Sequence, residues 1–460
     1  MATTSRLDRS LTGVERRRRS VTLVALSLTF ALVQLDATIV NVALPTLRSR
    51  LGGGVGAAQW VIDGYAVPFA ACMLTAGALG DRHGHRRTCV LGFGLFGLAS
   101  VAAALAGGWP LLIGARVVQG VGAATMLPAS LAMITELYPE PRERSRALGV
   151  WGGVATFGFA AGPLLGGVLI TVSSWPAIFW INLPAAALVG TVIALLGPVE
   201  RPRERGLHPL GTVLGIAALG CLTGGIIEYG EGSLPIGSLV LVAAVLTGVA
   251  FGWIERHGRH PLVPPDLLAS ASFRWALTSG FLFNFAMYGA LLCVSLTLQG
   301  GFGFSALAGG LAVLPMAVVV SIGSTTSGFV AAATGPRRPM IAGFVCAGIG
   351  ALVIAAGALA SSAGLIIGGL AGIGLCSLAM PAMTSVALDA APARHAGLGG
   401  GSLNTARQIG GAVGVAVLGA ILNAGGERSG FAVALAIAAA GCAVGVMSTV
   451  EATRARKEGR

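Results

Sequence analysis

Charge is scarce in this sequence of 460 residues, of which 10% are Asp, Glu, Lys or Arg and 55% are hydrophobic. A soluble chain of this length would need far more polar surface to cover itself. Lysine occurs once, at Lys457, so arginine carries nearly all of the positive charge behind the net charge of +12. On a soluble domain such a charge would suggest nucleic acid, but this composition indicates a membrane protein. We therefore expect the lipid bilayer as a partner, and no nucleic acid.

Common signatures of catalysis and metal binding are also missing. A Walker A motif needs a lysine after a glycine-rich loop, and the single lysine has no such loop before it. The sequence has no HExxH and no GxSxG, and its seven cysteines form no CxxC pair. "GFGLFG" (92–97) has GxGxxG spacing, but it lies in an apolar run with no strand before it. We expect no enzyme activity, no metal site and no cofactor, and we expect the cysteines to be small buried side chains.

Long apolar runs are what the sequence has in abundance. A helix needs about 20 apolar residues to cross the hydrocarbon core, whereas a transmembrane barrel would show shorter segments of alternating polarity. The sequence therefore predicts an all-α polytopic membrane protein. We place fourteen crossings at 18–44, 58–80, 88–107, 109–134, 146–171, 176–198, 209–229, 234–254, 274–299, 305–333, 339–360, 363–387, 400–423 and 429–450. The least certain division is at "ASSAG", between the eleventh and twelfth.

The arginines predict the orientation of these crossings. If the N-terminus is cytoplasmic, all but five of the 30 Lys and Arg residues lie in cytoplasmic tails and loops. The exceptions are Arg48, Arg50 and Arg428 outside, and Arg116 and Arg407 within helices. Because Lys and Arg are retained on the cytoplasmic side during insertion, this bias favours an even number of crossings with both termini cytoplasmic.

A repeated turn predicts how the crossings are grouped. "GALGDRHGHRR" (77–87) aligns without gaps with "GFVAAATGPRR" (328–338), and these stretches follow the second and the tenth crossing. Parallel halves of six helices each, with the substrate site between them, are a known transporter plan. We expect an N-terminal bundle at 1–200, a linker with two helices at 201–260 and a C-terminal bundle at 261–460.

Several motifs together resemble one family. The turn at 77–87 is similar to the helix 2–3 loop motif of the major facilitator superfamily, and "LIGARVVQGVGAA" (112–124) is similar to its helix 4 motif. "GFAAGPLLGGVL" (158–169) resembles the helix 5 motif of its antiporters. Four further stretches are similar to the fourteen-helix drug:proton antiporter family: "LDATIVNVALP" (35–45), "QWVIDGYAV" (59–67), "SSWPAIFWINLPAA" (173–186) and, more loosely, "LNTARQIGGAVGVAVLG" (403–419).

The resemblance implies a major facilitator fold in a bacterial plasma membrane. It further implies a proton-coupled exporter of small hydrophobic or amphipathic compounds, such as drugs and antibiotics, which works by alternating access and is functional as a monomer. The energy source would be the proton gradient. A carrier for another small molecule or a lipid remains an alternative, as does a non-enzymatic membrane sensor. An intramembrane enzyme is disfavoured by the missing catalytic motifs.

Three charged residues within the crossings are candidates for proton coupling. Asp36 lies about 20 Å along its helix, at 1.5 Å per residue, and Arg116 reaches a similar depth from the opposite side. A charge at this depth is costly, so it faces a cavity or a partner. A carboxylate balanced between pairing and desolvation can bind and release a proton. The resemblance supports this role for both, against a static ion pair, and Asp63 is either a third member or an interfacial acid.

The turn at 77–87 is a candidate gate. Glycine permits a tight turn and a close approach, and an aspartate can accept hydrogen bonds from a helix N-terminus or pair with an arginine across the bundle interface. The resemblance implies that the turn latches the cytoplasmic side, whereas a solvated loop would explain the arginines alone. The candidate residues are Gly77, Gly80, Asp81, Arg82, Gly84, Arg86 and Arg87. His85 occupies a position where the family motif has a basic residue.

The fifth crossing has glycines at every fourth position, which places small residues on one helix face. Proline within this helix removes one backbone hydrogen bond and favours a bend. The resemblance implies that the helix seals the interface between the halves, with Gly158, Gly162, Pro163, Gly166 and Gly167 as the motif. Ordinary helix packing is the alternative.

Seven polar residues within the apolar crossings are candidates for lining the central cavity. Arg407 lies about 10 Å from the inner end of its helix, too far from Asp36 in depth to be an easy partner. A structural hydrogen-bonding role is its alternative. The seven are Asn41, Gln59, Gln119, Asn284, Asn404, Arg407 and Gln408.

Overall fold

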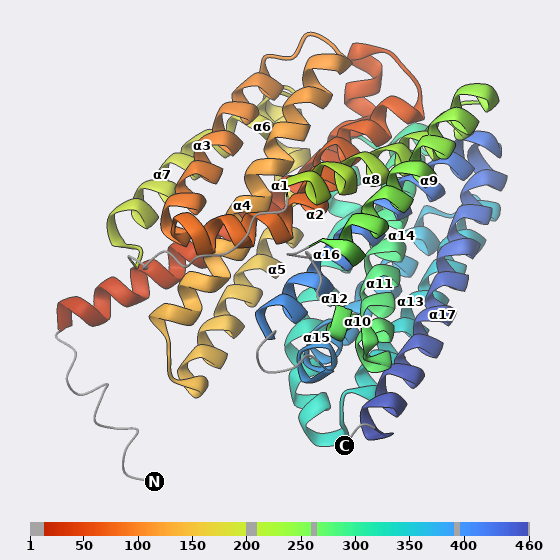
Figure 1. Cartoon of the computed structure of the whole chain (residues 1–460). Helices are drawn as coiled ribbons and strands as arrows, with labels where there is room; N and C mark the ends of the chain where they lie inside the picture. Colours follow the sequence, from red (N-terminus) through yellow and green to blue (C-terminus); the bar gives the residue numbers. More distant parts are fainter. Residues whose placement is uncertain (1–12, 199–208, 259–264, 391–395, 459–460) are drawn as a thin grey trace.

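The computed structural model describes residues 13–198, 209–258, 265–390 and 396–458, and in these ranges every regular element is a helix (Figure 1). The elements of the first part are α1 (Gly13–Leu51), α2 (Val55–His83), α3 (His85–Ala104), α4 (Trp109–Leu137), α5 (Pro141–Val172), α6 (Ala177–Trp180), α7 (Asn182–Leu196), α8 (Pro209–Gly230) and α9 (Leu234–His257). Those of the second part are α10 (Pro265–Ala269), α11 (Ala271–Leu296), η1 (Thr297–Gly301), α12 (Ala306–Thr334), α13 (Arg337–Leu359), α14 (Ala363–Gly374), η2 (Leu375–Leu378), α15 (Ala379–Ala390), α16 (Ala396–Ala424), η4 (Gly426–Gly430) and α17 (Phe431–Glu458).

Thirteen helical segments of the described ranges are long and apolar enough to cross a membrane, and α2 becomes the fourteenth when its two arms are counted as one span. The arms meet at a bend of 54°. This agrees with the predicted crossings, including the division at "ASSAG", where α13 ends at Leu359 and α14 begins at Ala363. Four crossings combine more than one element: α6 and α7 share one, α11 and η1 another, α14, η2 and α15 a third, and η4 and α17 a fourth.

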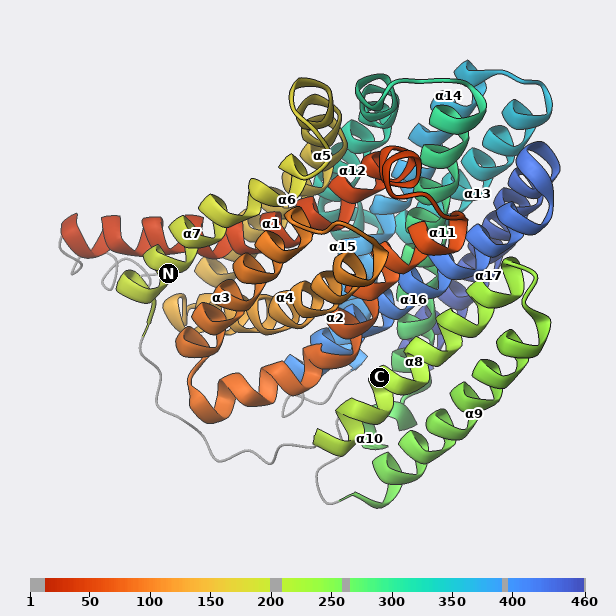
Figure 2. The same cartoon turned by 90° about the horizontal axis from the view of Figure 1, so that it is seen from above.

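The helices form two bundles. Helices α1–α7 pack through the pairs α1–α5, α3–α4, α2–α4 and α3–α7, and we call them the N-terminal bundle. Helices α11–α17 pack through α11–α16, α11–α17, α13–α17 and α13–α14, and we call them the C-terminal bundle. Figure 2 shows the two groups side by side, the first in red to yellow-green and the second in green to blue.

The two bundles meet mainly through α5 with α12 and α2 with α16. The second and fifth crossings of one bundle therefore contact the fifth and second crossings of the other, which is the pattern that two parallel repeats produce. The predicted domain limits at 200 and 260 fall in the ranges 199–208 and 259–264, which lie outside the described residues. The division of the chain at those residues stays a prediction.

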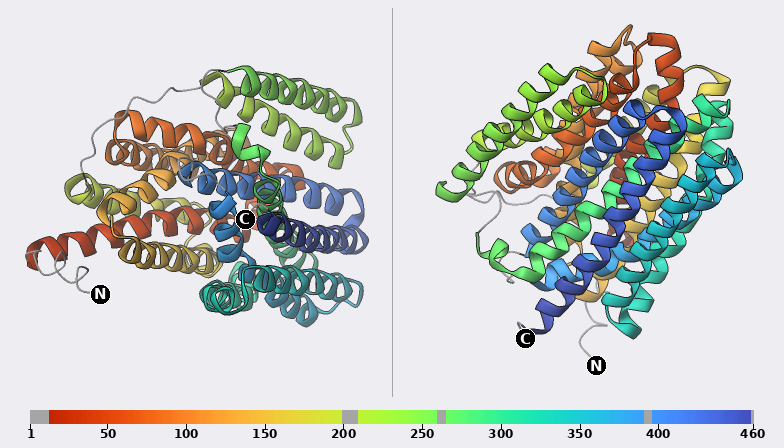
Figure 3. Two further views of the ribbon diagram at one scale, coloured as in Figure 1. Left: turned by 60° about the horizontal axis from the view of Figure 1, so that its bottom comes forward. Right: turned by 90° about the vertical axis from the view of Figure 1, so that its right-hand side faces the viewer.

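Helices α8 and α9 form a hairpin on the outside of the bundles (Figure 3). Helix α8 contacts both α2 and α16, so it covers the line where the bundles meet. Glu231 Oε1 accepts a hydrogen bond from the Gly56 amide at 2.7 Å, and Asn423 Nδ2 donates to the Gly230 carbonyl at 2.7 Å. Helix α9 exposes large apolar side chains such as Leu239, which is 71% exposed. Such a surface is stable in lipid rather than in water.

Candidate functional site

Asp36 of α1 and Arg116 of α4 form an ion pair in the interior of the N-terminal bundle. Arg116 Nη1 lies 2.5 Å from Asp36 Oδ2. Asp36 is 0% exposed and Arg116 is 1% exposed. Removing either partner from such a site leaves a buried charge without compensation, which is strongly destabilising. The structure therefore places together the two residues that the sequence assigned to one depth.

Neutral side chains complete the coordination of this pair. Asn182 Nδ2, from the first turn of α7, donates to Asp36 Oδ1 at 2.7 Å. Gln119 accepts from Arg116 Nη1 at 3.1 Å and donates to Ser100 Oγ at 2.7 Å. Arg116 Nε donates to the Val61 carbonyl at 3.0 Å. Helices α1, α2, α3, α4 and α7 thus contribute to one buried polar network, and a network of this kind fixes the positions of its members when its groups are satisfied.

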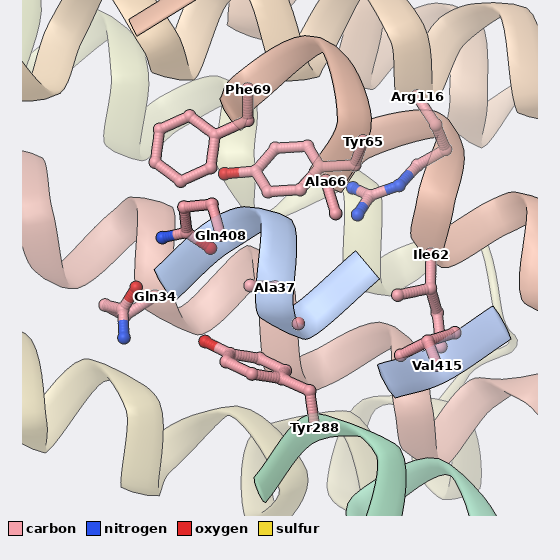
Figure 4. Close-up of a pocket in the computed structure, with 11 residues that line it drawn as sticks. Gln34, Ala37, Ile62, Tyr65, Ala66, Phe69, Arg116, Tyr288, Gln408 and Val415 are labelled. Carbon is pink, nitrogen blue, oxygen red and sulfur yellow. The ribbon is translucent and has the colours of Figure 1, made fainter. Parts of the chain in front are cut away.

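Arg116 also lines a small, partly open cavity between the two bundles, which we call the Arg116 cavity (Figure 4). Its guanidinium lies 4.3 Å from the centre of the Tyr65 ring. Tyr288 enters the cavity wall from α11, on the opposite bundle. The full lining is Gln34, Ala37, Ile62, Tyr65, Ala66, Phe69, Arg116, Tyr288, Gln408, Gly411 and Val415. The arginine of the buried ion pair is therefore in a position to contact whatever occupies this cavity.

A second small, partly open cavity shares Gln34 with the first, and we call it the Arg407 cavity. Its walls come from α1 and α5 on one side and from α11, α12, η2, α15 and α16 on the other. The lining is Phe30, Gln34, Gly152, Ala155, Thr156, Phe159, Phe283, Met287, Val320, Ser324, Ser377, Met380 and Arg407. Aromatic and thioether side chains with a few polar groups are typical of small-molecule sites.

Two of the seven predicted cavity residues, Arg407 and Gln408, lie on these cavity walls. Arg407 is 9% exposed, and its guanidinium lies 5.2 Å from the centre of the Phe283 ring. Arg407 Nε has no hydrogen-bond partner among the residues that the structure describes. A structural hydrogen-bonding role for Arg407 is therefore not supported at Nε by any bond among the described residues.

The other five predicted cavity residues are absent from the linings of the two cavities. Gln59 Nε2 donates to the Val415 and Ala416 carbonyls at 3.0 and 2.9 Å, so it joins α2 to α16. Asn404 also links these helices, through Met73 Sδ at 3.1 Å. Gln119 belongs to the Asp36 network. The remaining two are buried amides: Asn41 donates to its own helix at 3.1 Å, and Asn284 is 1% exposed.

Asp63 lies in α2 and is 0% exposed. Both of its carboxylate oxygens are without a hydrogen-bond partner among the described residues. Whether Asp63 takes part in proton coupling or is an interfacial acid stays a prediction. A buried carboxyl group without partners carries a desolvation cost that protonation reduces.

The glycines of the fifth crossing serve two different contacts. A Cβ atom at Gly158, Gly162 or Gly166 would collide with α1, in the same bundle. The contact across the bundles uses Pro163, whose carbonyl lies against Gly310, and Gly167, which lies against Ala306 and Leu307. The repeated glycines therefore hold α5 close to α1, and the residues beside them face α12.

The turn between α2 and α3 is tight. Gly84 has φ of 94°, a value that favours glycine, and its amide donates to the Gly80 carbonyl at 2.8 Å. The His85 ring occupies the space that a side chain at residue 80 would need. His85 Nε2 lies 3.1 Å from Asp81 Oδ1, and Arg86 Nη1 donates to the Gly197 carbonyl at 3.4 Å. Gly77 faces Pro128 of α4, and Arg82 and Arg87 are exposed.

Several residues of this site were not predicted from the sequence. One is Asn182, a lone amide at the start of an apolar crossing, within the stretch 173–186. Tyr65, Tyr288 and Gln34 line the Arg116 cavity, and tyrosine is a rare residue in this chain, with four in total. Polar residues in otherwise apolar crossings are the signal that could have found them. No group of three or more His, Cys, Asp or Glu side chains suited to a metal ion occurs in the described ranges.

Comparisons with known proteins agree with this architecture. The sequence matches the family model of the Major Facilitator Superfamily over residues 26–415 and 316–460. It is 36% identical to the multidrug resistance protein Stp of Mycobacterium tuberculosis (strain CDC 1551 / Oshkosh), over 89% of this chain and 76% of that protein. It is 34% identical to the methylenomycin A resistance protein of Bacillus subtilis (strain 168), over 87% of each chain, and 33% identical to the tetracenomycin C resistance and export protein of Streptomyces glaucescens, over 88% and 76%.

Solved structures show the same fold. A peptide transporter POT in complex with sulfate has a TM-score of 0.72 at 15% identity and covers 94% of this chain and 95% of its own. A bacterial homologue of the human lysosomal transporter Spinster has a TM-score of 0.69 at 18% identity, with coverages of 96% and 98%.

Two helical bundles with cavities between them define a multi-pass carrier of the cell membrane. The chain belongs to the major facilitator superfamily.

Proposed function

We propose that this protein exports small hydrophobic or amphipathic compounds, drugs and antibiotics among them, in exchange for protons. The observation that carries the proposal is the Asp36–Arg116 pair, which is fully buried and whose arginine reaches a cavity between the bundles. Relatives at 33–36% identity are a multidrug resistance protein and resistance or export proteins for methylenomycin A and tetracenomycin C, which supports the substrate class. The carrier acts as a monomer, needs no cofactor and is not an enzyme.

Proton binding at Asp36 alters the cavity through Arg116. While Asp36 is ionised, it neutralises Arg116 at 2.5 Å. When Asp36 accepts a proton, Arg116 loses its counter-charge and is no longer held by the pair, so the wall of the Arg116 cavity changes. Asp63 is a second acid on the proton path. Proton binding thus changes the cavity in which the substrate binds, and exchange requires that the changed cavity bind the substrate less tightly.

Alternating access comes from movement of the two bundles against each other. The pairs α5–α12 and α2–α16 form the interface, and Gln59 and Asn404 cross it. The turn that contains Asp81 and Gly84 gates the cytoplasmic side. Small residues at Gly167 and Gly310 allow the backbones of α5 and α12 to approach closely and to separate as units.

A drug-susceptibility panel tests the proposal on cells that express the protein. We expect the wild type to protect against several apolar antibiotics, a protonophore to remove that protection, and Asp36→Asn to abolish it while the protein remains in the membrane. The matched control is Glu136→Gln, which alters an exposed carboxylate at the end of α4 and should protect like the wild type. Full protection by Asp36→Asn, or protection that persists with the protonophore, contradicts proton coupling.

A further inference from the structure

The charges of the two cavities are all of one sign. Among their lining residues, all of which lie in the described part of the chain, two carry a formal charge, and these are Arg116 and Arg407. Asp36 pairs with Arg116 but lines neither cavity. Asp63 also lines neither cavity. A lipophilic cation would therefore meet arginine in these cavities and no lining carboxylate that could pair with it, so these linings disfavour a cation.

The two arginines differ in their partners. Arg116 is neutralised by Asp36, whereas Arg407 has neither an ion-pair partner nor a hydrogen-bond partner for Nε among the described residues. Arg407 is nonetheless more than nine-tenths buried and faces the Arg407 cavity. An arginine at membrane depth is costly unless it is paired or faces a functional cavity. A ligand group that accepts hydrogen bonds would supply the missing partner.

Other groups around Arg407 fit an amphipathic ligand. The Phe283 ring lies beneath the guanidinium at 5.2 Å, within the range of a cation–π contact. Ser377 Oγ lines the same cavity, is 1% exposed and has no hydrogen-bond partner within the described ranges. Phe30, Phe159 and Met287 provide apolar walls. The site thus offers a cationic donor, a hydroxyl and a large apolar surface.

We propose that Arg407 anchors the carboxylate, or a comparable acidic group, of the exported compound, so that the carrier selects amphipathic organic anions. This inference rests on the proposed export function and names its substrate class. The apolar body of the anion lies against Phe30, Phe159 and Met287. Since an anion leaves while protons enter, each cycle moves positive charge inward, and a membrane potential that is negative inside assists export.

The test uses two fluorescent probes of similar size and opposite charge, pyrenebutyrate and pyrenebutylamine. Binding of each is measured with the purified full-length protein in lipid nanodiscs, with empty nanodiscs subtracted. We expect the wild type to bind pyrenebutyrate about tenfold or more tightly than pyrenebutylamine, because a charge-assisted hydrogen bond contributes at least that factor. Equal binding of the two probes overturns the inference.

Variants locate this selectivity. Arg407→Gln should weaken pyrenebutyrate binding about tenfold or more and strengthen pyrenebutylamine binding, and Arg407→Lys should retain part of the preference for the anion. Arg338→Gln, at an exposed arginine near the start of α13, is the matched control and should bind both probes like the wild type. If Arg407→Gln does not fold, the ratio of pyrenebutyrate to pyrenebutylamine binding in the wild type and in Arg407→Lys still tests the inference. Unchanged anion binding in either folded Arg407 variant overturns the inference.

The experiment separates this inference from the proposed function, because binding in nanodiscs requires neither a proton gradient nor transport. If the wild type shows no anion selectivity while its export is protonophore-sensitive, the role of Arg407 alone is overturned. Anion selectivity that persists in a protein without protonophore-sensitive export supports the role of Arg407 and contradicts the exchange mechanism.

Discussion

At the scale of single residues, the site depends on how each polar group of a buried network is satisfied. Asp36 Oδ1 receives its short hydrogen bond from Asn182 at 2.7 Å, while Gln119 lies at 3.5 Å from the same atom. A buried acceptor that loses its donor bears its full desolvation cost. Asn182 is therefore a positioning residue for Asp36, although it contacts neither cavity directly.

We predict that Asn182→Ala lowers stability by about 1–3 kcal/mol and reduces proton-driven export, because Asp36 loses its nearest neutral donor. The matched control is Asn41→Ala on α1. Asn41 is equally buried, but its amide donates to the Ala37 carbonyl of its own helix. Thermal unfolding of the purified protein and export of the same antibiotic measure both effects. Equal losses in the two variants would show that Asn182 acts only as a packed amide.

At the scale of helices, close packing of α5 against α1 requires glycine at defined positions. A Cβ atom at Gly158 would overlap backbone atoms of Ala31, whereas the space around Gly153 on the same helix is open. Backbone atoms cannot move aside as a flexible side chain can. The added methyl group must therefore separate the two helices.

We predict that Gly158→Ala destabilises the protein by about 1–3 kcal/mol through overpacking. Gly153→Ala, on the same helix, should be neutral or slightly stabilising, because alanine is the better helix former. The apparent melting temperature in detergent distinguishes the two. A Gly158→Ala protein as stable as the wild type would mean that α1 and α5 are not packed as closely as the structure places them.

Sequence alone predicted the helices well and the site in part. Hydropathy predicts a crossing because each span must be apolar along most of its length, and this succeeded even for α13 and α14. Counting residues along each helix predicted a similar depth for Asp36 and Arg116, and the two side chains form an ion pair. Contacts between distant helices were out of reach: Asn182 reaches Asp36 across 146 positions, and Gln59 reaches Val415 across 356. Those contacts depend on helix rotation, which hydropathy does not report.

At the scale of the whole molecule, the polar network and the cavities occupy different places. The Asp36 network lies within the N-terminal bundle, whereas both cavities have walls from both bundles. Arg116 belongs to the network and to a cavity. A proton taken up inside one bundle can therefore change a site that both bundles share, which is the link that exchange requires.

Coupled transport in proteoliposomes tests this link most directly. The compound with the largest protection in the susceptibility panel is added under an imposed pH gradient, and its accumulation is recorded together with proton flux. The account predicts that the wild type moves the compound against its gradient while protons flow the opposite way, and that Asp36→Asn does neither. Accumulation that continues after the pH gradient and voltage are collapsed, or proton exchange that survives in Asp36→Asn, would contradict it.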